Sequence, residues 1–181
     1  VTVEDKIAPV ISVNENFTAQ LDASGSAVIT AAQINNATTD NCDASSSMTY
    51  SLDKTNFDCS NIGNNTVVLT VTDSKGNSQT KSVTVKVEDK VAPVVLVQNY
   101  TVQLDASGAA SITTANINNG SSDNCGIQTM SLDKTSFDCS NLGANTVTLT
   151  VVDVNGNSST KTATVTVEDK IAPVISVNEN F

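Results

Sequence analysis

The sequence predicts an all-β protein made of two tandem antiparallel β-sandwich domains, and three observations lead to this class. Hydrophobic residues alternate with polar ones over short segments, turn-forming residues separate these segments, and the whole pattern occurs twice. The chain has 181 residues, which suits two small domains. Hydrophobic residues make up 39% of it and aromatic residues only 3%, so the expected cores are small and aliphatic.

The alternation predicts half-buried strands at matching places in the two halves of the chain. Turn chemistry separates them, as in Asp-Ala-Ser-Gly at 22–25 and Gly-Asn at 76–77. The alternating hydrophobic positions are Phe17, Ala19, Leu21, Val67, Leu69, Val71, Val83, Val85 and Val87 in the first half, and Tyr100, Val102, Leu104, Val147, Leu149 and Val151 in the second.

Comparison of the two halves assigns further positions. Ile29 matches Ile112, whereas the adjacent Val28 matches a serine, so Ile29 and Ile112 should point inward. Thr30 and Gln33 have the spacing of a capping box, which predicts one short helical turn after Thr30. About 80 residues per unit suit seven short strands, or six, in an immunoglobulin-like sandwich.

The repeat itself contains long identical strings. Val-Glu-Asp-Lys-Ile-Ala-Pro at 3–9 returns with one substitution at 87–93 and unchanged at 167–173. Residues 1–17 and 165–181 are identical, which is typical of a segment from a longer array of two-repeat blocks, although an engineered duplication would give the same identity. The predicted division is 1–5 as the end of a preceding repeat with its linker, 6–88 and 89–169 as two repeats, and 170–181 as the start of the next.

Composition excludes several classes of function. The chain has no histidine, so it carries no Ser-His-Asp or Cys-His nucleophile and no histidine-ligated zinc. All nine basic residues are lysines, and the net charge of −10 repels nucleic acid and anionic membranes. No apolar run approaches the roughly 20 residues of a membrane span, and no signal peptide is visible. We expect a monomer that does not insert into membranes.

Each repeat contains two cysteines, and four cysteines allow three connectivities. The repeat favours Cys42–Cys59 and Cys125–Cys139, one disulfide inside each domain. Each such bond would contribute roughly 3 kcal/mol in the chain-entropy model, and disulfides indicate an oxidising, extracellular setting. The alternative, a four-cysteine metal site, lacks the usual C-x₂-C spacing.

Acidic residues recur at places that an immunoglobulin-like topology brings to one end of the domain, namely the start of the first strand and the B–C and F–G loops. Clustered carboxylates repel one another unless a cation joins them, and carboxylate and amide oxygens suit Ca²⁺. The expected ligands are Glu4, Asp5, Asp40, Asn41 and Asp73 in the first repeat, Glu88, Asp89, Asp123, Asn124 and Asp153 in the second, and Asp169 after it.

The alternative is that these residues form Asx-turns and solvated loops without a metal. Asp22 and Asp105, in the Leu-Asp-Ala-Ser-Gly turns, are interpreted as turn caps. Asp53 and Asp133, each followed by a lysine, are interpreted as surface residues.

With these motifs identified, the chain resembles the HYR-like and bacterial immunoglobulin-like tandem repeats of very large Bacteroidota surface adhesins of the gliding-motility type. The residues that carry the resemblance are Val-Glu-Asp-Lys-x-Ala-Pro, [Ser/Thr]-Asp-Asn-Cys, Phe-Asp-Cys-Ser-Asn and Val-x-Asp-x-x-Gly-Asn, each present in both repeats. The resemblance implies an extracellular stalk exported by type IX secretion. It also implies Ca²⁺ at Asp5, Asp40, Asp73, Asp89, Asp123, Asp153 and Asp169. No cysteine follows the Gly-Asn at 76–77 or 156–157, which departs from the common HYR pattern and favours the shorter cysteine pairing.

The hypothesis is therefore a non-enzymatic stalk segment of a giant cell-surface adhesin, stiffened by Ca²⁺ at interdomain junctions and supporting attachment or gliding. Its partners would be neighbouring repeats and, through other regions, surface polysaccharide. The alternative is a carbohydrate-binding module. Few aromatic residues are present to form a sugar platform, and Phe17, Tyr100 and Phe181 are expected in the core. A glycosidase with paired acids is a third, weaker hypothesis.

Overall fold

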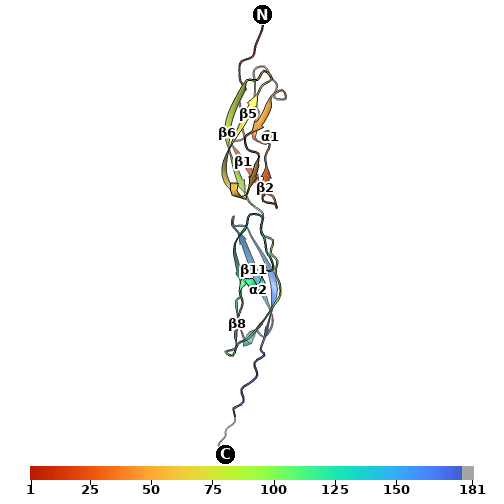
Figure 1. Ribbon diagram of the computed structural model, residues 1–181, viewed down its shortest axis with the longest axis vertical. Coiled ribbons are helices and arrows are strands. Elements are labelled where there is room, and N and C mark those ends of the chain that lie inside the picture. The colour runs from red at the N-terminus through yellow and green to blue at the C-terminus, as the bar shows by residue number, and fades with distance from the viewer. Residues whose placement is uncertain (177–181) are drawn as a thin grey trace, which may run out of the picture. The chain divides into compact units, whose positions relative to one another are not determined.

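The structure is a computed structural model that describes residues 1–176. It divides into two compact units, the first formed by residues 1–91 and the second beginning at Ala92. Each unit is a β-sandwich, so the predicted fold class is confirmed (Figure 1). Among residues 1–176 no helix is long or apolar enough to span a membrane.

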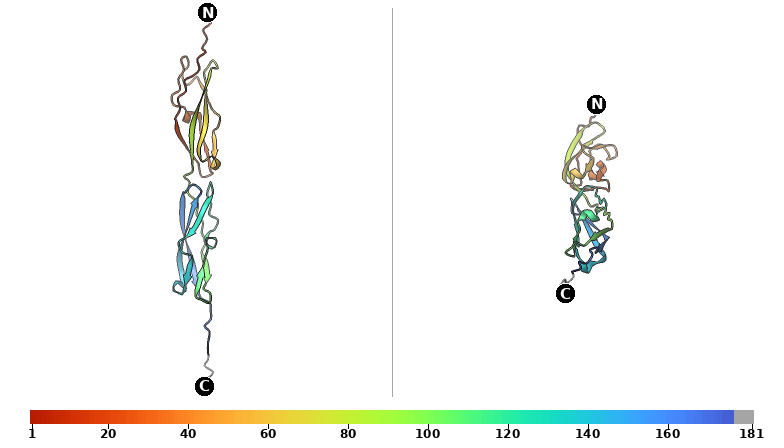
Figure 2. Two further views of the ribbon diagram at one scale, coloured as in Figure 1. Left: turned by 90° about the vertical axis from the view of Figure 1, so that its left-hand side faces the viewer. Right: turned by 60° about the horizontal axis from the view of Figure 1, so that its bottom comes forward.

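The first unit has six strands, one α-helical turn and one 3₁₀ turn. In chain order they are β1 (Asn16–Gln20), β2 (Ser26–Val28), α1 (Ala31–Ile34), β3 (Thr49–Leu52), β4 (Asn56–Asp58), η1 (Cys59–Asn61), β5 (Gly63–Thr72) and β6 (Ser78–Glu88). One layer is the sheet β1-β6-β5-β3, and the other contains the pair β2-β4. The long strands β5 and β6 form an antiparallel hairpin, and β1 joins β6 in parallel (Figure 2).

The second unit repeats this order and topology. Its elements are β7 (Tyr100–Gln103), β8 (Ala109–Ser111), α2 (Thr114–Ile117), β9 (Ile127–Leu132), β10 (Ser136–Asp138), η2 (Cys139–Asn141), β11 (Gly143–Asp153) and β12 (Ser158–Glu168). The sheet β7-β12-β11-β9 faces the pair β10-β8. In both units isolated bridges fasten the segment before the first strand to the chain after the helical turn, as Val10 does to Thr39.

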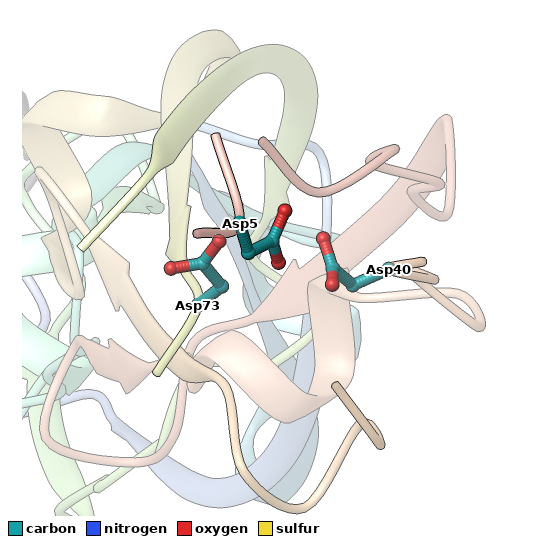
Figure 3. A group of neighbouring side chains, drawn as sticks. All are labelled: Asp5, Asp40 and Asp73. Atoms are coloured by element: carbon teal, nitrogen blue, oxygen red, sulfur yellow. The ribbon is translucent and has the colours of Figure 1, made fainter. Parts of the chain in front are cut away.

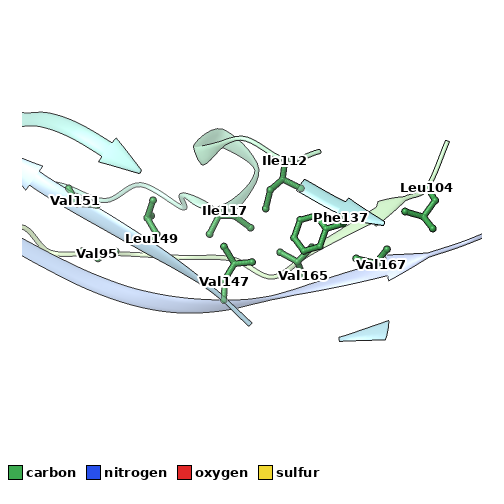
Figure 4. Packing of buried hydrophobic residues seen from close by; sticks show 11 residues of the cluster. Val95, Leu104, Ile112, Ile117, Phe137, Val147, Leu149, Val151, Val165 and Val167 are labelled. Atoms are coloured by element: carbon green, nitrogen blue, oxygen red, sulfur yellow. The ribbon is translucent and has the colours of Figure 1, made fainter. Parts of the chain in front are cut away.

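The cores contain the residues that the alternation placed inside. Figure 4 shows the second core, where Val147, Leu149 and Val151 of β11 are fully buried and belong to the same cluster as Phe137. Ile112 and its equivalent Ile29 are buried, which confirms the inward assignment.

The prediction that Phe17 and Tyr100 lie in the core is only partly confirmed. Phe17 and Tyr100 are only half-buried, because they lie on β1 and β7, the edge strands of their sheets. The buried aromatic residues are instead Phe57 and Phe137, each 3% exposed. Phe181 lies outside the described residues.

The predicted helical turn after Thr30 is confirmed as α1. The backbone N–H of Thr30 donates to Oε1 of Gln33 at 2.8 Å, and the N–H of Gln33 donates back to the Thr30 carbonyl at 3.1 Å. In the second unit, Asn116 takes the place of Gln33 and accepts from the N–H of Thr113 at 2.8 Å. Each turn carries a fully buried isoleucine, so this short helix is held by the core as well as by its cap.

The predicted pairing of cysteines inside each repeat is wrong. Cys42 and Cys139 are free thiols, whereas Cys59 and Cys125 are disulfide-bonded, so neither repeat has the expected internal bond. Within a unit the two cysteines lie at opposite ends. Cys42 is near the start of β6, whereas Cys59 lies beside the carbonyl of Gly25 near its end. The 11 residues of β6 span more than about 30 Å, and a disulfide requires Cα atoms about 4.4–6.8 Å apart.

Candidate metal site

Three segments that are far apart in the sequence bring Asp5, Asp40 and Asp73 together in the first unit. Asp5 precedes the first bridge to the loop, Asp40 directly follows the bridged Thr39, and Asp73 directly follows β5. One carboxylate oxygen of each lies within 4.8 Å of the others, and Figure 3 shows the three side chains converging. We call this group the first acidic trio.

Asp40 is fixed by an Asx-turn in its loop. Its Oδ2 accepts hydrogen bonds from the backbone N–H groups of Cys42 at 2.8 Å and Asp43 at 3.0 Å. These bonds leave Oδ1 to face the other two aspartates. An Asx-turn was the alternative to a metal site at this position. Here the Asx-turn of Asp40 also orients its carboxylate so that it can serve as a metal ligand.

Asp73 closes the turn between β5 and β6. Its Oδ1 accepts from the N–H groups of Lys75 and Asn77, both at 2.8 Å, and its Oδ2 accepts from Nδ2 of Asn77 at 2.7 Å. Burial raises the pKa of Asp73, but these hydrogen bonds outweigh it and hold the pKa below its ordinary value. Asp73 is therefore a charged carboxylate with only 5% of its surface exposed.

Asp5 is the third member, and asparagine side chains orient it. Its Oδ1 accepts from the N–H of Ile7 at 3.1 Å and from Nδ2 of Asn41 at 3.3 Å. Nδ2 of Asn77 also donates to the backbone carbonyl of Asp5 at 3.2 Å, so Asn77 connects two members of the trio. Sequence reasoning did not identify Asn77, although the recurring Asp-x-x-Gly-Asn motif was the signal for it.

Two oxygens of the trio are buried without a hydrogen-bond partner. They are Oδ2 of Asp5 and Oδ1 of Asp40, the atoms left over by the bonds that fix each carboxylate. Burying a carboxylate oxygen without a donor is costly, and neighbouring like charges add to that cost. A cation bound among these oxygens would offset both penalties.

The second repeat keeps the same residue types. Asp89, Asp123 and Asp153 form the second acidic trio, with one oxygen of each within 4.8 Å of the others. Oδ2 of Asp123 accepts from the N–H groups of Cys125 and Gly126, while its Oδ1 is buried without a partner. Asp153 repeats the contacts of Asp73 and is fully buried.

The remaining predicted ligands are engaged elsewhere. Glu4 pairs with Lys6 at 3.0 Å, and Glu88 pairs with Lys86 at 2.6 Å. The Lys86 partner accounts for most of the lowering of the pKa of Glu88. Asn41 donates to the trio rather than presenting its oxygen to it.

Two further predicted ligands, Asn124 and Asp169, belong to neither trio. Asn124 follows Asp123 and is half-buried. Asp169 is exposed and accepts from the N–H of Ile171 at 2.9 Å.

The interpretation of the other aspartates is largely confirmed. Asp22 accepts from the N–H and hydroxyl of Ser24 at 2.8 and 2.6 Å, and Asp105 does the same in its own turn, so both are turn caps. Asp53 is exposed as expected, but it also fastens two strands, because its Oδ1 accepts from the N–H of Val68 at 2.8 Å. Asp133 makes the equivalent bond to Thr148.

No known protein family and no curated protein matches the chain in sequence. Among solved structures, human protocadherin-24 EC1-2 is similar at 12% identity and a TM-score of 0.48, covering 91% of this chain and 100% of that one. Drosophila N-cadherin EC1-4 matches at 14% identity and a TM-score of 0.44, covering 90% and 50%. Human mucin-like protocadherin EC1-2 matches at 13% and 0.37, covering 88% and 98%. At these values the likenesses carry no inference about ligand or function.

Proposed function

We propose that this chain is a structural segment of a repetitive extracellular adhesin, and that each acidic trio binds Ca²⁺. The observation that carries this proposal is the pair of buried, unpartnered carboxylate oxygens in the first acidic trio, facing the carboxylate of Asp73. The other oxygen of each carboxylate is held by N–H groups, so the side chains are already oriented without the ion.

The donor set favours Ca²⁺ over other cations. The trio offers only oxygen ligands, and Ca²⁺ accepts 6–8 of these with flexible geometry. Magnesium would retain more water, and zinc favours nitrogen and sulfur ligands, which the trio lacks. Extracellular modules bind Ca²⁺ at about 10⁻⁴–10⁻³ M, which would suit a site assembled from three loop aspartates.

The mechanical role follows from how the chain is connected. Asp89 comes directly after Glu88, the last residue of β6, and it is a member of the second acidic trio. An ion bound by Asp89, Asp123 and Asp153 would therefore restrain the linker that leaves the first repeat. We propose that this restraint stiffens the array.

An extracellular, non-enzymatic role is consistent with the remaining features. Cys59 and Cys125 are disulfide-bonded, and disulfides are typical of oxidising compartments. The acidic groups occupy loops of a plain sandwich. Attachment or gliding at the surface of a Bacteroidota cell, and export by type IX secretion, are proposed from the resemblance of the repeat motifs alone.

Chelation tests the proposal. Adding excess EDTA to the full chain should lower its melting temperature in calorimetry by several degrees, and 1 mM CaCl₂ should restore it. Asp40→Asn should abolish part of this response, whereas Asp22→Asn, a turn cap outside the trio, should leave it intact. Identical melting curves with EDTA and with Ca²⁺ would contradict the proposal.

The stiffening role needs its own readout. In solution scattering, Asp89→Asn should broaden the distribution of chain dimensions in the presence of Ca²⁺, and Asp22→Asn should not. Equal profiles for the two variants would leave calcium binding standing but remove the mechanical role. Binding on a glycan array by the purified chain would instead favour the carbohydrate-binding module.

A further inference from the structure

We propose that Asn119 is a site of spontaneous chemical modification, at which deamidation through a succinimide converts the side-chain amide to a carboxylate. The proposal concerns the loop of residues 119–121 in the second unit, which lies between the bridged residues Asn118 and Ser122. It is independent of Ca²⁺ binding and goes beyond the proposed function.

Deamidation of an asparagine in a folded chain has three local requirements. The side-chain amide must be free to turn toward the backbone, and the N–H of the next residue must be available as the nucleophile. The next side chain must also leave space for the ring that forms, which glycine does best because it has no Cβ. The chain itself holds the two reacting groups close together, so the reaction is intramolecular.

Asn119 and Gly120 meet these requirements. Both residues are exposed. Within residues 1–176, neither the side chain of Asn119 nor the N–H of Gly120 has a hydrogen-bond partner. Gly120 has φ of +81°, and no atom beyond the adjacent residues lies within 4 Å of the position that a Cβ would occupy there. The attacking nitrogen is therefore open to solvent, which can accept its proton.

The first repeat contains the same loop with one difference. The N–H of Asn36 donates to the carbonyl of Ser12 at 2.8 Å, as the N–H of Asn119 donates to the carbonyl of Leu96 at 2.9 Å. Asn36 is also exposed, but Ala37 follows it, with φ of +56°. The Cβ of Ala37 crowds the nitrogen that would attack, so Asn36 should react far more slowly. The two asparagines provide a matched comparison within one chain.

The other Asn-Gly pair of the chain is held differently. Asn155 and Gly156 lie in the turn that Asp153 closes. The N–H of Gly156 donates to the carbonyl of Asp153 at 3.4 Å, and the N–H of Asn155 donates to Oδ1 of Asp153 at 2.8 Å. The nucleophile of this pair is engaged, so the turn must open before the reaction can occur. We therefore expect the folded chain to modify Asn119 and to spare Asn155, although glycine follows both.

The reaction consumes water and releases ammonia. The backbone nitrogen of Gly120 loses its proton to solvent and attacks Cγ of Asn119, which closes a cyclic succinimide. The bond between Cγ and Nδ2 breaks, and the departing nitrogen takes up a proton and leaves as ammonia. Water then hydrolyses one of the two C–N bonds of the ring. Cleavage at Cγ gives aspartate, and cleavage at the backbone carbonyl gives isoaspartate.

The products change the loop in a defined way. Both replace a neutral amide by a carboxylate, which adds one negative charge to the loop that leads to Asp123. Isoaspartate also lengthens the main chain by one atom between the bridged residues Asn118 and Ser122, because the chain then runs through Cβ and Cγ. The modified chain is therefore separable from the fresh chain by anion exchange.

Incubation of the full chain in mildly alkaline buffer tests the proposal. Samples are digested, and mass spectrometry of the peptides follows the conversion of each asparagine. We expect Asn119 to convert at least about tenfold faster than Asn36 or Asn155, which corresponds to about 1.4 kcal/mol in activation free energy. The chain unfolded in urea is the reference, because Asn155 should there react as fast as Asn119.

Two reciprocal variants test the cause of this selectivity. Gly120→Ala should lower the rate at Asn119 at least about tenfold, and Ala37→Gly should raise the rate at Asn36 by the same factor. Gly120→Ala should fold, since alanine already occupies the equivalent position of the first repeat with positive φ, and its melting temperature checks this. If it does not fold, Ala37→Gly decides the question.

Three results would overturn the proposal. One is equal conversion of Asn119 and Asn36 in the folded chain. Another is the same ratio of rates at Asn119 and Asn155 in the folded and the unfolded chain, since the turn of Asp153 would then give no protection. The third is a rate at Asn36 that does not respond to Ala37→Gly.

Discussion

The two repeats build the loop after their Asp-Asn-Cys motif differently. In the first repeat, residues 43–48 separate Cys42 from β3, and the carboxylate of Asp43 accepts from the N–H and hydroxyl of Ser74 at 2.6 and 3.0 Å. In the second repeat, β9 begins directly after Gly126, whose carbonyl accepts from the N–H of Val154 at 3.1 Å.

Despite this difference, both loops hold their first aspartate in the same way. Oδ2 of Asp40 and of Asp123 accepts from the N–H groups two and three residues later in the chain, and Oδ1 of each is left without a donor. Both loops are also fastened to the turn that follows the long strand. The two loops differ in length and in the group that accepts the hydrogen bond from the turn, a carboxylate in one and a backbone carbonyl in the other. The carboxylates of Asp40 and Asp123 are nevertheless held in the same way, which is expected if they have a function.

Removing the buried aspartate of the second repeat should have the largest effect. Asp153→Ala removes a fully buried carboxylate that accepts three hydrogen bonds, so we expect a loss of about 3 kcal/mol in the free energy of unfolding by denaturant. The matched control Asp133→Ala removes one strand-fastening bond from an exposed residue and should cost about 1 kcal/mol or less. Equal losses would show that Asp153 is not the anchor of its turn.

Converting the loop of one repeat to that of the other should have an intermediate effect. Asp43→Gly removes both bonds to Ser74 and should cost about 1–2 kcal/mol. Faster hydrogen exchange at the Ser74 amide would locate the change.

The reciprocal change, Gly126→Asp, should also destabilise the chain, because Gly126 has φ of +112°, which side-chain-bearing residues rarely adopt. Stabilisation by Gly126→Asp would mean that the two loops are interchangeable.

The smallest expected effect on stability concerns the Leu-Asp-Ala-Ser-Gly turns, which have the same contacts in both repeats. The Ser24 and Ser107 side chains, with nearby N–H groups, hold the pKa of Asp22 and of Asp105 below the ordinary 3.8. The contribution of these two carboxylates to the free energy of unfolding is therefore complete above pH 3.8, and it is lost as the pH falls through their lower pKa in the folded state. Asp105→Asn should flatten the dependence of unfolding free energy on pH in acid, and Asp22→Asn should do so equally, since the two turns have the same contacts. A steeper acid dependence in either variant would refute this assignment.

Local patterns in the sequence predicted much of the fold because their causes are local. The alternation of Val67, Leu69 and Val71 reflects burial on one face of a strand, and the capping pair Thr30 and Gln33 needs only one turn of chain. Knowledge of which loops share an end of the sandwich was sufficient to place Asp5 beside Asp40.

The wrong predictions, the cysteine pairing and the glutamate ligands, concern residues that are close in sequence but whose side chains do not meet in the folded domain. The motifs of Cys42 and Cys59 are close in sequence, yet the chain between them crosses the length of the sandwich, so their proximity in sequence misled. Glu4 and Glu88 adjoin the trios in sequence, but side chains alternate along an extended segment and these two meet lysines instead.

The central claim is that the acidic trios bind a divalent cation, and calcium titration of the EDTA-treated chain by calorimetry tests it most directly. The account predicts saturable binding with a Kd of about 10⁻⁴–10⁻³ M. It also predicts that Asp40→Asn and Asp123→Asn together abolish binding, while Asp22→Asn and Asp105→Asn together do not. Absence of saturable heat at millimolar Ca²⁺, or equal binding by the two double variants, would contradict it.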